Sequence, residues 1–143
     1  MKKIFVLISL TTLFFACVVE EPNIITNYNI TNISGQKITI VPEFPLVGSN
    51  FNFDSVIFHN NENFEIQYSE PGGYFGVPLD DVRLLKIYFN DTILVVNYRD
   101  SASFFPSGNI QKLSDWTGGK INDYFFKFEF SFTEADYLEA LKQ

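Results

Sequence analysis

The chain has 143 residues, of which 46% are hydrophobic and 17% aromatic, and its formal net charge is −7 at pH 7. This length suits one ordinary domain with a sizeable apolar core. The acidic balance argues against nucleic acid as a partner, because the phosphate backbone repels a negatively charged protein. A single cysteine excludes an intramolecular disulfide, so the core has to hold the fold without one.

The first sixteen residues are typical of a secretory signal peptide. Two lysines, Lys2 and Lys3, precede an apolar run from Ile4 to Ala16 that is interrupted only by Ser9, Thr11 and Thr12. Thirteen residues are too few to cross a bilayer as a helix, which takes about 20. We therefore expect residues 1–16 to be removed. The loss of both lysines would leave eight basic residues against 17 acidic ones, a formal charge of −9.

The stretch Phe14-Phe15-Ala16-Cys17 resembles the lipobox of bacterial lipoproteins, in which Leu, a small or branched residue and Gly, Ala or Ser precede the modified cysteine. The chain departs from that pattern at two positions, both occupied by Phe. The resemblance implies that Cys17 carries a lipid, which would anchor the protein to the membrane. The alternative is an ordinary signal peptide or membrane anchor followed by a chance cysteine.

Residues 17–25 are expected to form the lipidated cysteine and a short tether, because Glu20-Glu21-Pro22 is charged and then breaks any helix. The two acids also resemble the segment that follows the cysteine in surface-exported lipoproteins of the Bacteroidetes type. This implies an outer-membrane lipoprotein, exposed at the cell surface or, alternatively, facing the periplasm.

Residues 26–143 are predicted to form one all-β domain, since Ile, Val, Phe, Tyr and Thr are dense and the turns are rich in Asn and Gly. Residues 24–33 and 37–44 are expected to pair as a hairpin around Ser34-Gly35-Gln36. A second hairpin is expected to join residues 51–58 to residues 64–68 through the loop at His59–Asn63.

A third hairpin is predicted in VRLLKIYFNDTILVVNYRD, with Asn90 and Asp91 as a two-residue loop that tolerates positive φ. This loop length sets the register of the two strands. On the face directed to the core, the expected pairs are Phe89 with Thr92, Ile87 with Leu94, and Leu85 with Val96.

The C-terminal part begins with a stretch from Ser101 to Lys120 that is expected to be irregular. An alternating strand follows, and its aromatic stripe is predicted to form the centre of the core, with a ligand-binding stripe as the alternative. Thr133 and Asp136 are suited to cap a helix over residues 134–141. The residues of the stripe are Tyr124, Phe126, Phe128, Phe130 and Phe132.

About seven strands with one short C-terminal helix predict an antiparallel β-sandwich of immunoglobulin-like type, with a small β-barrel as the alternative. The order of strands, the NISG turn and the YFFKFEFSFTEADY ending are similar to small uncharacterised lipoproteins of Bacteroidetes. That resemblance implies no particular activity.

The residues needed for common catalytic sites are scarce. His59 is the only histidine and falls in a predicted turn, so neither a nucleophile–base pair nor a metal site is expected. No phosphate-binding loop or other cofactor motif is found. The remaining enzymatic alternative is a small hydrolase that acts on glycans through a carboxylate pair such as Asp80-Asp81. Solvated loop charges are the preferred explanation of that pair, and a weak Ca²⁺ site comes next.

Aromatic residues in glycine-containing loops are candidates for ligand binding, because exposed rings stack on sugars. Trp116 in SDWTGGK, and Tyr74 and Phe75 in EPGGYFGVP, have this setting, although such rings more often belong to the core. The expected function is a non-enzymatic binding or accessory module of the cell envelope, with a protein or a glycan as its ligand.

Three tripeptides resemble the O-glycosylation acceptor of exported Bacteroidetes proteins: Asp, then Ser or Thr, then an apolar residue. The resemblance implies modification at Ser55, Thr92 and Ser101, and chance occurrence is the alternative.

Overall fold

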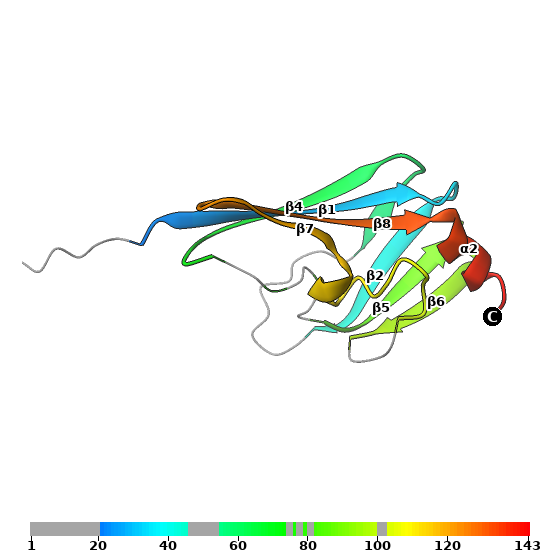
Figure 1. Ribbon diagram of the computed structural model, residues 1–143. Coiled ribbons are helices and arrows are strands. Elements are labelled where there is room, and N and C mark those ends of the chain that lie inside the picture. The colour runs from blue at the N-terminus through cyan, green and yellow to red at the C-terminus, as the bar shows by residue number, and fades with distance from the viewer. Residues whose placement is uncertain (1–20, 46–54, 74–75, 77–78, 80–81, 100–102) are drawn as a thin grey trace, which may run out of the picture.

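The computed structural model describes residues 21–45, 55–73, 76, 79, 82–99 and 103–143 (Figure 1). Within these residues, eight strands form two open four-stranded sheets that pack face to face, which confirms the predicted β-sandwich with a short C-terminal helix. The elements in chain order are β1 (Asn23–Ile33), β2 (Ile38–Pro45), β3 (Val56–Phe58), β4 (Asn63–Pro71), β5 (Val82–Phe89), β6 (Ile93–Tyr98), η2 (Leu113–Asp115), β7 (Thr117–Asn122), β8 (Phe125–Thr133) and α2 (Glu134–Ala140).

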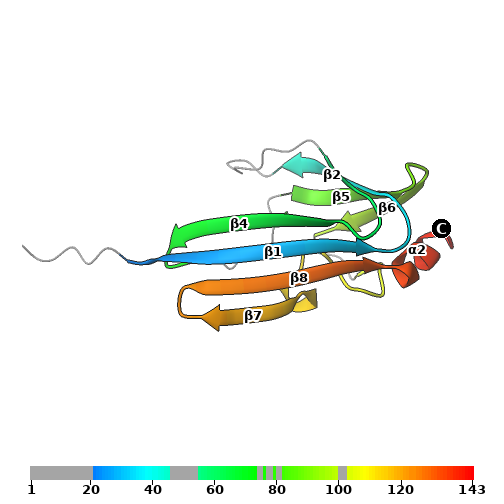
Figure 2. The same cartoon turned by 90° about the horizontal axis from the view of Figure 1, so that it is seen from above.

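The first sheet has the order β4-β1-β8-β7, which Figure 2 shows from above, and the second has the order β3-β2-β5-β6. All neighbouring strands are antiparallel except β1 and β8, which lie parallel at the centre of the first sheet. The predicted β1–β2 and β3–β4 hairpins are wrong, because both connections pass from one sheet to the other. A short turn rich in Asn and Gly can join two strands of one hairpin or two strands of different sheets. Its composition therefore does not distinguish the two kinds of connection.

A buried asparagine ties these two crossings together. The amide nitrogen of Asn32 donates to the carbonyls of Gln36 (2.7 Å) and Phe58 (3.1 Å), one on each connection. Its amide oxygen accepts from the hydroxyl of Ser34 (2.7 Å), and its backbone carbonyl accepts from the Asn61 amide (2.6 Å). Asn32 is fully buried, and its side chain makes all the hydrogen bonds that a buried amide requires.

The substitution Asn32→Asp should lower the free energy of unfolding by about 2 to 5 kcal/mol, because it replaces two buried donors with a carboxylate oxygen that faces two carbonyls. Asn63→Asp, at an exposed position of β4, should change the stability by about 0.5 kcal/mol or less. Urea denaturation of both variants measures the difference. Equal stabilities would contradict a structural role for the Asn32 amide.

The β5–β6 hairpin differs from its predicted register by one residue. Asn90 and Asp91 do have positive φ values of 49° and 61°, but Thr92 also belongs to the turn. Phe89 therefore pairs with Ile93, Ile87 with Val95 and Leu85 with Asn97. The predicted core face of β5 is confirmed, since all three of its residues are fully buried, whereas the slip exchanges the two faces of β6.

Leu94 is consequently 36% exposed on the outer surface, and Val95 takes the core position. We expect Ile87→Ala to cost about 2 to 5 kcal/mol of stability, since it leaves a cavity in the core. Leu94→Ala should cost clearly less, because the site is already open to water. Thermal and urea unfolding distinguish the two registers: a Leu94→Ala variant as unstable as Ile87→Ala would support the two-residue loop.

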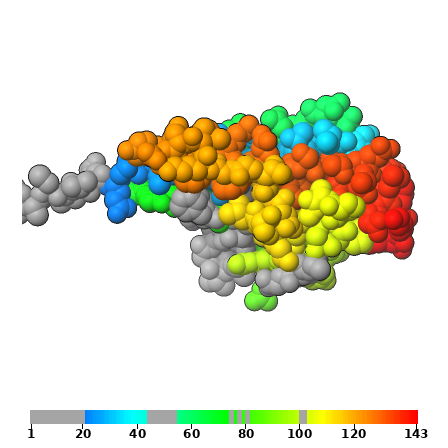
Figure 3. Space-filling view, in the orientation of Figure 1, coloured from blue at the N-terminus to red at the C-terminus, as the bar shows by residue number. Residues whose placement is uncertain are grey.

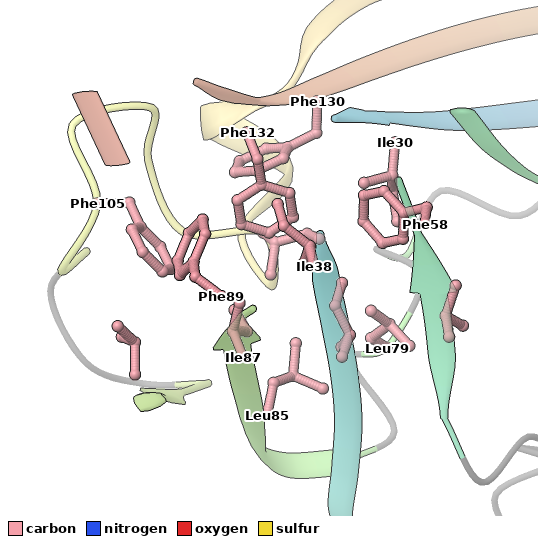
Figure 4. Packing of buried hydrophobic residues seen from close by; sticks show 14 of the residues in the cluster. Ile30, Ile38, Phe58, Leu79, Leu85, Ile87, Phe89, Phe105, Phe130 and Phe132 are labelled. Atoms are coloured by element: carbon pink, nitrogen blue, oxygen red, sulfur yellow. The ribbon is translucent and has the colours of Figure 1, made fainter. Parts of the chain in front are cut away.

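The aromatic stripe of β8 is only half in the core. Phe130 and Phe132 are buried and point toward Phe89 and Phe105, as Figure 4 shows, while Phe128 is partly buried and stacks on Tyr28 with ring centroids 5.3 Å apart. Tyr124 at the other end is exposed. The prediction that the whole stripe forms the core is wrong at this end, because the strands of the second sheet back only the C-terminal half of β8 (Figures 1 and 2).

Strand β7 lies within the stretch that was expected to be irregular. Its sequence, TGGKIN, lacks the β-branched and aromatic residues by which strands are recognised. Gly118 is required by close packing as well as by its φ of 109°, since a Cβ there would lie 2.2 Å from the carbonyl oxygen of Lys127. Gly118 therefore lets β7 pack against β8, and both glycines weaken the sequence signal of the strand.

The predicted cap of the C-terminal helix is confirmed, and it has a further role. The buried carboxylate of Asp136 accepts hydrogen bonds from the Thr133 amide (2.7 Å) and hydroxyl (3.0 Å). Its other oxygen accepts from the backbone amide of Ser107 (2.9 Å). Asp136 thereby also holds the loop before β7 in place. The capping pattern does not predict this contact, because that pattern is local.

Candidate functional site

The outward-facing side of the β3-β2-β5-β6 sheet carries the most unusual surface among the described residues. Paired residues of neighbouring strands share one face of a sheet. Ile57 pairs with Thr39, Thr39 with Tyr88, and Tyr88 with Leu94, so one row of side chains crosses all four strands. We call this surface the outer face. Its residues are Thr39, Val41, Glu43, Ile57, Leu84, Lys86, Tyr88, Leu94, Val96 and Tyr98.

The outer face is largely apolar, although the solvated side of an antiparallel sheet is usually polar. Ile57 and Tyr98 are each more than half exposed, and Leu94, which is 36% exposed, lies beside Tyr88. Val96, one row further along β6, extends the same apolar surface. A contiguous apolar surface of this kind is typical of an interaction site, whereas scattered single residues are not.

A shallow depression of about 240 Å³ lies on the outer face and is lined by Thr39, Val41, Tyr88 and Asp91. Pockets that enclose whole small molecules are usually about 300 to 1,000 Å³. This depression is therefore suited to a single inserted group, such as an apolar side chain or one sugar ring.

Two ion pairs border the depression. Lys37 binds Asp91, whose other oxygen accepts from the Thr39 hydroxyl (3.4 Å), and Lys86 binds Glu43. The hydrogen bond to Glu43 raises the pKa of Lys86, the charge of Glu43 acts in the same direction, and partial desolvation opposes both. Lys86 consequently stays charged and paired at neutral pH, so the border of the depression is polar but carries no excess charge.

A buried amide network supports the sheet from behind. The Asn97 amide of β6 donates to the side-chain oxygens of Asn109 and Gln111, both at 2.9 Å. Gln111 in turn donates to the carbonyls of Leu79 and Val82, also at 2.9 Å. This network fixes the loop after β6 against the sheet, which keeps the outer face on a rigid support.

Trp116 lies in the core and offers no ring for stacking. It is 7% exposed, its indole nitrogen donates to the Ile110 carbonyl (2.9 Å), and its ring meets Tyr28 edge-on at 5.5 Å. The core alternative therefore applies, and the ligand-binding interpretation of Trp116 is corrected. Tyr74 and Phe75 lie outside the described residues.

Two of the three tripeptide acceptors are at exposed positions. Ser55 directly precedes β3, and Thr92 lies in the β5–β6 turn. The third, Ser101, falls outside the described residues, as do Cys17 and the Asp80-Asp81 pair. His59 is exposed in the β3–β4 connection, where its backbone amide donates to the Glu62 carboxylate (2.7 Å).

Across the described parts of the chain, no three His, Cys, Asp or Glu side chains are grouped so as to hold a metal ion. In those same parts, no helix is both long enough and apolar enough to span a membrane.

The sequence interpretation did not identify the outer face as a site, and the cause is the one-residue slip at the β5–β6 turn. With Asn90 and Asp91 alone in the loop, Leu94 and Val96 were assigned to the core. A three-residue turn moves both to the solvent side, where Leu94 pairs with Tyr88 and Val96 pairs with Lys86. The alternation in β6 does not reveal the slip, because the polar residue Asn97 is the one that the structure buries.

A scan against protein-family models finds no match to this chain, and comparisons with curated proteins and with solved structures find none either. The function therefore has to be inferred from the chemistry of the surface itself.

Proposed function

We propose that the protein is a lipid-anchored, non-enzymatic lipoprotein of the outer membrane, at the cell surface or the periplasmic face, that binds a partner protein through the outer face. The observation that carries the binding role is the outer face, where the row of Ile57, Thr39, Tyr88 and Leu94 crosses all four strands and three of its four side chains are aliphatic or aromatic. The anchor is supported by the basic and apolar leader that ends at Cys17, and by the start of the folded domain at Asn23, six residues later.

The chemistry of the outer face favours a protein partner over other ligands. Protein interfaces combine apolar side chains with paired polar groups, and the outer face presents Ile57, Leu94 and Val96 together with two ion pairs. The rigid, preformed sheet lowers the ordering cost of association. The depression beside Tyr88 provides a recess for one side chain of the partner.

A glycan is the second candidate ligand, supported by a different feature of the same surface. The Tyr88 ring lies beside the depression, and Thr39 and Asp91 add oxygen acceptors at its wall. A ring with neighbouring acceptors is the usual arrangement for holding one sugar residue. The aliphatic residues of the outer face would then take no part in binding.

Leu94→Asp should abolish capture of the partner from detergent-solubilised envelopes of the native cell, because a charge placed among the apolar side chains of the interface stays unpaired and desolvated. Leu138→Asp is the matched control, since Leu138 is similarly exposed but lies on α2. Crosslinking followed by mass spectrometry measures capture, and circular dichroism checks that both variants are folded.

The same two variants also separate the alternatives. If both recover the same proteins as wild type, the outer face is not the protein interface. Glycan-array binding that survives Leu94→Asp but is lost in Tyr88→Ala would favour the sugar ligand instead.

Cys17→Ala should abolish metabolic labelling with a clickable fatty acid and release the protein from membranes, because no other cysteine remains to carry a lipid. Labelling and membrane fractionation of the wild type and the variant measure both effects. Persistent labelling in Cys17→Ala would contradict the lipid anchor.

A further inference from the structure

Two exposed apolar side chains mark one end of the β4-β1-β8-β7 sheet. Ile121 and Tyr124 flank the turn between β7 and β8, and each is more than half exposed. We call residues 121–124 the hairpin tip. Figure 3 shows the β7–β8 hairpin beside the start of β1 at this end of the molecule.

The hairpin tip is bonded directly to the first strand. The backbone amide of Ile25 donates to the carbonyl of Tyr124 (2.8 Å), so the tip lies where β1 begins. Cys17 precedes Asn23 by six residues, and an extended chain advances at most about 3.3 to 3.6 Å per residue. The hairpin tip is bonded to Ile25, eight residues after Cys17, so a lipid on Cys17 would hold the tip within about 30 Å of the membrane.

The chemistry of the hairpin tip suits the boundary between lipid headgroups and acyl chains. Tyrosine is enriched in this layer because its ring is apolar and its hydroxyl remains hydrated, and Ile121 adds an aliphatic side chain beside it. The charges at the tip are paired, since Lys120 binds Asp123 at 2.7 Å. That hydrogen bond, and then the charge of Lys120, lower the pKa of Asp123, so the pair persists at neutral pH.

The neighbouring acids limit how deep the contact can be. Glu21 and Glu70 are exposed near the start of β1, where Glu70 pairs with Ile24. Because carboxylates are costly to remove from water, only the hairpin tip can enter the headgroup layer. Ile121 and Tyr124 alone would also bury too little surface for a stable protein interface. They are enough to orient a domain that a lipid already holds at the membrane.

We propose that the hairpin tip rests in the membrane interface beside the lipid anchor. This contact orients the domain so that its long axis points away from the bilayer surface. This inference rests on the proposed lipidation of Cys17. The surface that the hairpin tip contacts is the lipid bilayer itself. In this orientation the outer face points sideways, where a partner protein can reach it.

The test uses the full-length acylated protein, in which the modified Cys17 leaves no other thiol to react. A nitroxide label is attached to Ile121→Cys or Tyr124→Cys, and the protein is reconstituted in phosphatidylcholine–phosphatidylglycerol vesicles. Electron paramagnetic resonance should show the label colliding more often with oxygen, which concentrates in lipid, than with a water-soluble nickel chelate. Ile33→Cys is the control, since Ile33 is half exposed but lies at the opposite end of β1, and its label should show the reverse preference.

Flotation of the same vesicles separates the two proposals. Wild-type protein that fails to float would overturn the anchor and the tip contact together. Protein that floats, but whose labels at positions 121 and 124 behave like the label at position 33, would overturn the tip contact alone. Addition of Tyr124→Asp to the Ile121→Cys protein should move the label into water if the Tyr124 ring contributes to the membrane contact. An unchanged collision preference of the label would contradict that contribution.

Discussion

The hydrogen bonds of Asn32 are the constraint on which the arrangement of strands depends. One buried amide binds both connections that cross between the sheets, at Gln36 and at Phe58. β1 and β2 belong to different sheets, where β1 lies between β4 and β8, and β2 lies between β3 and β5. The Asn32 amide also favours this topology over others. A different pairing of these strands would leave its N–H donors without acceptors in an apolar core. The apolar side chains supply the driving force for collapse, and this polar group selects one topology.

The sequence predicts the parts of the fold that depend on local pattern. Alternation identifies β8 and the core face of β5, and the spacing of Thr133 and Asp136 identifies the helix cap. The errors arise where the outcome depends on distant residues. The β5–β6 turn has three residues rather than two because Thr92 closes it by a bond to the Phe89 carbonyl, while the Asn90 side chain accepts from the Lys37 amide across the sheet (3.1 Å). The outer face could not be predicted for the same reason, because its composition follows from that one residue of turn length.

The structure combines surfaces of different kind on one small domain. The side of the first sheet that faces water is polar, as in Asn27, whose amide binds Glu65 (2.7 Å), and Lys127, which pairs with Glu129. The corresponding side of the second sheet is more apolar, and its charged side chains form two ion pairs. An exposed apolar sheet face carries a risk of aggregation, and it brings no advantage if the face only contacts water. The asymmetry is therefore best understood as a functional property of the second sheet.

The parallel pairing of β1 with β8 has a consequence for how the chain acquires its structure. The first strand of the domain and the last are neighbours at the centre of one sheet, with about a hundred residues between them. Contacts of such high sequence separation make folding slow, since a long loop has to close before they form. A chain that emerges from a ribosome or a translocation channel N-terminus first therefore presents β1 with one edge unsatisfied until residue 125 and beyond have arrived. An uncovered strand edge is a site of intermolecular association, so the nascent protein would depend on a chaperone for longer than a domain built from consecutive hairpins.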